Sequence, residues 1–72
     1  MAFTQAQLQA QIDSEGLNCK ITQFANTASA SYTDVYVQNL NKSSSVKTGW
    51  VQIAQSNTAA QAATALKAGL TR

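Results

Sequence analysis

The hexapeptide YTDVYV at positions 32–37 decides the fold. β-Branched and aromatic residues dominate it, and they alternate with a period of two, which is typical of a β-strand. We therefore predict a strand over residues 32–40. One face of this strand carries Val35 and Val37, and the other carries Tyr32, Asp34 and Tyr36.

Two more stretches have the same alternation. Residues 17–22 place Leu17, Cys19 and Ile21 opposite Asn18, Lys20 and Thr22, which suits a half-buried strand. Residues 48–55 place Val51 and Ile53 opposite Trp50 and Gln52. The small and polar residues 25–31 and the turn-rich residues 41–45 are predicted loops. The strands over 32–40 and 48–55 are expected to pair as an antiparallel hairpin.

A helix is predicted before these strands. Thr4 and Gln7 have the spacing of a capping box, and Phe3 and Leu8 that of a hydrophobic staple. Gly16 is expected to end the helix in the left-handed conformation, with Leu17 folding back onto the last turn. The acidic residues near this end are expected to be exposed.

A second helix is predicted at the other end of the chain. Thr58 and Gln61 repeat the capping-box spacing, and Gly69 is expected to mark the end of the helix. One broad face carries Ala59, Ala62, Ala63, Leu66 and Leu70. The order of helix, two or three strands and helix predicts a single small two-layer α+β domain over residues 1–72.

Composition limits what such a domain does. The chain has 72 residues, one cysteine and no histidine, so it lacks an internal disulfide and the four N/S ligands of a structural zinc site. A core this small gains little stability alone, which makes self-association or a protein partner the expected supplement. Charged residues are 11% of the chain, the net charge is +2 and the lysines are scattered, so a dedicated nucleic-acid binder is disfavoured.

Neither a membrane nor an export signal is indicated. The N-terminus has no basic stretch followed by an apolar block, and no run approaches the roughly 20 apolar residues of a membrane span. We expect the protein in the cytoplasm of the producing cell, where a virion component would also be made.

Catalytic groups are scarce. Cys19 has no histidine to activate it, and Lys20 points to the opposite face of the same strand, so a buried, inert thiol is expected. Asp13 and Glu15 are two residues apart and do not share a helical face. No glycine-rich phosphate loop is present. The sequence therefore predicts no enzyme, no metal, no cofactor and no small-molecule substrate.

The candidate interface consists of the aromatic residues Tyr32, Tyr36 and Trp50, with Lys42 and Lys47 at the hairpin end. Alternation shows that the sheet has two faces without showing which is inside. The aromatic residues form the core if their face is buried. They form an exposed patch typical of interfaces if the valine face is buried. Such a patch could also stack single-stranded bases, which two lysines support only weakly.

The opening MAFTQAQL, at positions 1–8, resembles the start of the small head–tail joining proteins of tailed phages, the lambda gpW-like family. The order of elements is also similar, because that family folds as two helices flanking a β-hairpin and acts as a ring-forming connector between portal and tail. The present chain differs in its low charge, its lack of a basic C-terminal tail and its extra strand. No functional residue of the family carries over to this chain.

The leading hypothesis is a non-enzymatic structural or interaction protein, a phage virion subunit that works as a homo-oligomer or bound to larger neighbours. One alternative is a small phage inhibitor that binds a host protein, although the chain lacks an acidic surface for charge mimicry. The other alternative is a single-stranded nucleic-acid module that uses Tyr32, Tyr36 and Trp50.

Overall fold

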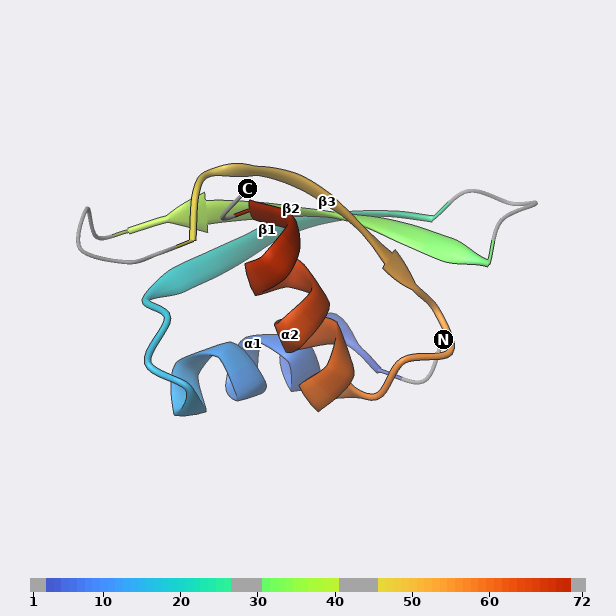
Figure 1. Ribbon diagram of the computed structural model, residues 1–72, viewed down its shortest axis with the longest axis horizontal. Helices are drawn as coiled ribbons and strands as arrows, with labels where there is room; N and C mark the ends of the chain where they lie inside the picture. Colours follow the sequence, from blue (N-terminus) through green and yellow to red (C-terminus); the bar gives the residue numbers. More distant parts are fainter. Residues whose placement is uncertain (1–2, 27–30, 41–45, 71–72) are drawn as a thin grey trace.

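The computed structural model describes residues 3–26, 31–40 and 46–70. In the sequence, one helix precedes and one helix follows a three-stranded sheet, as predicted (Figure 1). In chain order the elements are α1 (Gln5–Ser14), β1 (Cys19–Asn26), β2 (Tyr32–Asn39), β3 (Gly49–Ala54) and α2 (Ala59–Leu70). The predicted loop over 41–45 and most of the predicted loop over 25–31 lie outside the described residues.

The sheet is an antiparallel meander in the order β1-β2-β3, so β1 and β3 form its two edges. The predicted antiparallel hairpin of the second and third strands is confirmed, with Val35 opposite Val51 and Tyr36 opposite Trp50. Figure 1 shows both helices on the same side of the sheet, where α1 lies against β1 and α2 against β3. The described residues thus form two layers, and none of their helices covers the other face of the sheet.

Helix α1 begins and ends where its local sequence predicts. The Thr4 Oγ1 accepts from the N–H of Gln7 at 3.1 Å, and the Gln7 Oε1 accepts from the N–H of Thr4 at 2.9 Å, which completes the capping box. Gly16 has a φ of 69°, and the N–H of Leu17 donates to the carbonyl of Ile12 at 3.3 Å. The left-handed glycine and this bond are features of a Schellman ending, which turns the chain back toward the sheet.

Strand β1 is longer than the sequence predicted. Its register with β2 shifts between Ile21 and Gln23, which is a β-bulge. The extra residue breaks the alternation, so that Ile21 and Phe24 both pack on the core. The predicted loop over 25–31 is therefore wrong at Ala25 and Asn26, which pair with β2.

Helix α2 has the predicted capping box, with Gln61 N–H to Thr58 Oγ1 at 3.2 Å and Thr58 N–H to Gln61 Oε1 at 3.0 Å. The prediction that Gly69 ends this helix is wrong, because the helix continues to Leu70 and Gly69 does not adopt a positive φ. A Cβ on Gly69 would lie 2.9 Å from Val51 Cγ1. Glycine is needed here because α2 approaches β3 closely.

The core lies between the sheet and the two helices. Its buried side chains are Phe3, Leu8, Ile12, Leu17, Cys19, Ile21, Val35, Val37, Val46, Val51, Ile53, Ala62, Ala63, Leu66 and Leu70. The valine face of the sheet is thus the buried one, which excludes the alternative in which Tyr32, Tyr36 and Trp50 form the core. Within the described ranges, no helix has the length and apolar character needed to cross a bilayer.

Candidate functional site

The face of the sheet that points away from the helices carries the three aromatic residues singled out from the sequence. Tyr36 and Trp50 are cross-strand partners, with ring centroids 5.0 Å apart and ring planes at 71°. This edge-to-face pair follows from the strand register, which places the two rings side by side. Trp50 is 50% exposed and Tyr32 47% exposed, although tryptophan is highly buried on average in folded proteins.

The three rings share one face without forming one cluster. Tyr32 lies four residues from Tyr36 along β2, which is about 13 Å in a strand. Asp34 and its partner Gln52 lie between them. The aromatic face, defined here as Tyr32, Asp34, Tyr36, Trp50 and Gln52, is therefore a strip with an aromatic pair at one part, a polar centre and a single tyrosine at the other end.

Of the two candidate lysines, the structure describes only Lys47. Lys47 is exposed and lies two residues before β3, whereas Lys42 falls outside the described residues. Lys20, which was not a candidate, lies on β1 opposite Gln38 and is exposed. Because Asp34 lies at the centre of the strip, its charge opposes a phosphate backbone crossing the two aromatic ends.

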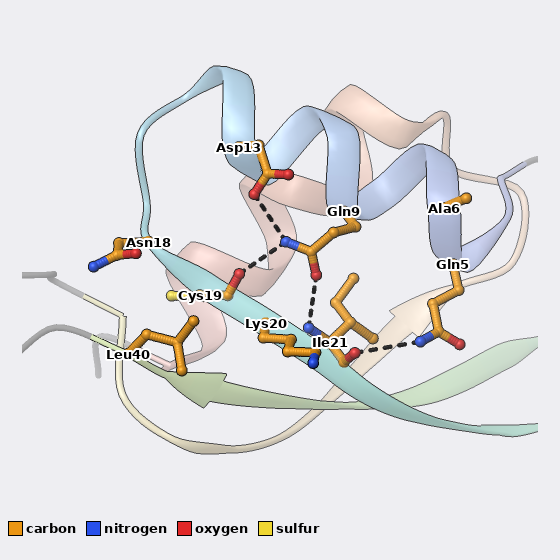
Figure 2. A pocket seen from close by; sticks show the side chains of 9 residues that line it. All are labelled: Gln5, Ala6, Gln9, Asp13, Asn18, Cys19, Lys20, Ile21 and Leu40. Carbon is orange, nitrogen blue, oxygen red and sulfur yellow. Dashed lines mark hydrogen bonds between the residues drawn. The ribbon is translucent and has the colours of Figure 1, made fainter.

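A second feature, which the sequence reading missed, is a groove of about 620 Å³ between α1 and β1. Figure 2 shows Gln9 reaching from α1 to the backbone of β1. The Gln9 Nε2 donates to the carbonyl of Cys19 at 2.8 Å, and the Gln9 Oε1 accepts from the N–H of Ile21 at 2.8 Å. The Gln5 Nε2 donates to the carbonyl of Ile21 at 3.3 Å.

The hydrogen bonds of Gln9 in this groove cover the backbone edge of β1. The Gln9 amide bonds the residues before and after Lys20, as a residue of a parallel strand would. Its Nε2 also donates to the Asp13 carboxylate at 3.0 Å. The polar groups of Gln9 are thus used within the chain, and they cover the edge of β1. The signal in the sequence was the spacing of Gln5 and Gln9, which places two amides on one face of the helix.

The residues considered for catalysis do not converge. Cys19 is buried, as predicted, and its Sγ donates to the carbonyl of Leu17 at 3.1 Å. Asp13 and Glu15 are exposed, as expected, and each accepts a hydrogen bond from a glutamine one turn earlier on α1. Asp34 lies on the far side of the sheet. In the part of the chain that the structure describes, no three His, Cys, Asp or Glu side chains gather as metal ligands would.

Comparisons with protein-family models, with curated proteins and with solved structures gave no match to this chain. The fold and the two features above are therefore the basis for assigning a function.

Proposed function

We propose that this protein is a non-enzymatic interaction subunit that binds another protein through the aromatic face of its sheet. The observation that supports the proposal is a sheet face without a helix over it, on which Trp50 is half exposed beside Tyr36. A three-stranded sheet with one wet face normally carries polar residues on that face. Large aromatic side chains there favour a surface that becomes buried in a complex.

The chemistry of this face favours a protein partner. Tyrosine and tryptophan supply much of the binding energy in protein interfaces, because they bury large areas while fixing few torsions. The Asp34 carboxylate at the centre of the strip offers a hydrogen-bond acceptor that a backbone N–H or an arginine would satisfy. The low charge of the chain, 11% of residues, weakens repulsion between neighbouring subunits.

The setting that we propose is a phage virion, as a connector or accessory subunit. Its support is the resemblance of residues 1–8 to head–tail joining proteins and the small, weakly charged α+β domain. A host-protein inhibitor and a single-stranded nucleic-acid module are the alternatives that the experiment must separate.

Site-specific photocrosslinking tests the proposal. A photoreactive phenylalanine analogue at position 32 samples the aromatic face, and the same analogue at position 15 samples the exposed end of α1. Crosslinking is performed in the cell that makes the protein, and the products are identified by mass spectrometry. We expect one discrete protein adduct from position 32 and none from position 15. Equal labelling from both positions, or none from position 32, contradicts the proposal.

The identity of the adduct separates the alternatives. A virion protein or a second copy of this chain supports the assembly role, whereas one stoichiometric host protein supports the inhibitor. Trp50 is the only tryptophan, so its fluorescence reports nucleic-acid binding directly. Strong quenching by oligonucleotides at low salt would favour base stacking instead.

A further inference from the structure

The two edges of the sheet are treated differently. An uncovered edge strand presents unpaired N–H and C=O groups that recruit a further strand. On the first half of β1 these groups are covered, because the amides of Gln9 and Gln5 bond the outward groups of Cys19 and Ile21 (Figure 2). The start of β1 is therefore closed to a further strand, and the edge of β3 has no such cover in the described residues.

The outward groups of β3 follow from the pairing pattern. The N–H of Gln55 donates to the carbonyl of Ser31 at 2.8 Å, so Gln55 faces the β2 side. Because antiparallel bonds alternate, Trp50, Gln52 and Ala54 direct their N–H and C=O groups away from β2. The carbonyl of Ala54 accepts from the N–H of Asn57 at 3.1 Å. Within the described ranges, no hydrogen bond reaches the outward groups of Trp50 or Gln52.

Space beside this edge is available for a strand. A groove of about 370 Å³ separates Trp50 and Gln52 from the small residues of α2, which are Ala65, Ala68 and Gly69. A second groove of about 380 Å³ continues from Ala65 and Ala68 across the exposed side of α2. A strand added to β3 would lie over these small side chains of α2. Because they are small, the added strand and the helix of its own chain could both pack close to α2.

The lack of charge on β3 and the neighbouring part of α2 favours a second copy of the same chain as the partner. Residues 48–66, which include β3 and most of α2, contain no charged side chain. Edge strands that avoid self-pairing usually carry lysine or another charge. The β3 edges of two copies of a chain with net charge +2 thus meet without like charges in contact. Trp50 and Gln52, whose outward N–H and C=O groups are unbonded in the described residues, lie one residue before and one residue after Val51. The edge is therefore complementary to a second copy of itself in antiparallel orientation.

We propose that two copies of this chain pair through β3 in antiparallel orientation, about a two-fold axis at Val51. Trp50 of each copy then exchanges backbone hydrogen bonds with Gln52 of the other, which makes four bonds and one six-stranded sheet. The α2 helices of the two copies lie side by side through Ala65 and Ala68. This inference shares with the proposed function only the assumption that the protein works in an assembly. It adds a specific contact between two copies, the edge of β3.

The expected affinity is modest. Six strand residues extend about 20 Å. A sheet layer and a helix layer with centres about 10 Å apart span about 20 Å once their own thickness is included, so the contact face measures about 20 Å in each direction. A contact of this size is at the low end of protein interfaces, below the roughly 800 Å² per partner of a standard one. We therefore expect a reversible dimer with a dissociation constant in the micromolar range.

Sedimentation equilibrium over a concentration series tests the dimer. Gln52→Pro removes one outward N–H and spares the bonds to β2, and Ala68→Glu places a charge on the exposed side of α2. We expect each variant to weaken association at least about tenfold. The matched control is Ala10→Glu, which makes the same change at an exposed position of α1 and should leave association unchanged.

A second measurement does not depend on the folding of any variant. Amide exchange of wild-type Trp50 and Gln52 should slow as the protein concentration rises, whereas exchange at Ile21 should not. A monomer up to millimolar concentration, or concentration-independent exchange at Trp50 and Gln52, overturns the inference. If the wild type is monomeric and the position-32 crosslink persists, the inference fails and the proposed function stands. If the dimer forms without that crosslink, the proposed function fails alone.

Discussion

Replacement of Gln9 by alanine tests how the edge of β1 is covered. The substitution removes the acceptor of the Ile21 N–H and the donor to the Cys19 carbonyl, both at 2.8 Å. It also removes the contact with the Asp13 carboxylate at 3.0 Å. The helix itself is preserved, because alanine is the strongest helix former.

The size of the effect follows from these bonds. Each of the two partly buried bonds to the strand contributes about 1 kcal/mol net. The exposed contact with Asp13 adds about 0.3 kcal/mol, which the better helix propensity of alanine offsets. We therefore expect a loss of about 2 kcal/mol if water replaces none of the lost bonds, and about 1 kcal/mol if it replaces half of them. The midpoint of thermal unfolding should fall by about 4–16 °C.

Amide exchange followed by NMR resolves the effect at the residue that carries it. Exchange at Ile21 should accelerate about 5–30-fold in the Gln9→Ala protein. The matched control is Gln11→Ala, which removes a similar amide from the same helix but only loses an exposed bond to Glu15. The control should change stability by less than about 0.5 kcal/mol. Equal protection of Ile21 in the two variants would refute the proposed role of Gln9.

Three further predictions follow from the packing and the helix ends. Gly69→Ala should lower the free energy of unfolding by about 1 kcal/mol in urea, because the clash with Val51 exceeds the gain in helix propensity; a stabilised protein would contradict this. Thr58→Ala should cost about 1 kcal/mol through the lost cap, whereas Ser56→Ala, just outside the cap, should cost almost nothing; equal losses would place the cap elsewhere. Cys19 should react with a thiol reagent at least about a hundredfold more slowly in the native protein than in urea; comparable rates would show that the thiol is accessible.

Local interactions were predictable because their partners are close in the sequence. The capping boxes that start α1 and α2, and the glycine ending of α1 at Gly16, involve residues within five positions of one another. The strands were predictable from alternation, since a period of two suits a surface buried on one side. The placement of Tyr36 and Trp50 on one face also followed, once their two strands were paired.

What depended on contacts between distant segments was decided only by the tertiary structure. Alternation gives two faces of a sheet, and only the docking of both helices on the valine face made the aromatic face the outer one. A helix end and a close approach both favour glycine, so Gly69 was assigned correctly only when Val51 was placed beside it. Likewise, the sequence shows Gln9 only as a polar residue of a helix. The tertiary structure places the backbone of β1 within hydrogen-bond distance of its amide. The sequence by itself determined the order of the elements and the capped helix ends at Thr4, Gly16 and Thr58, whereas packing determined which of their surfaces remain available to a partner.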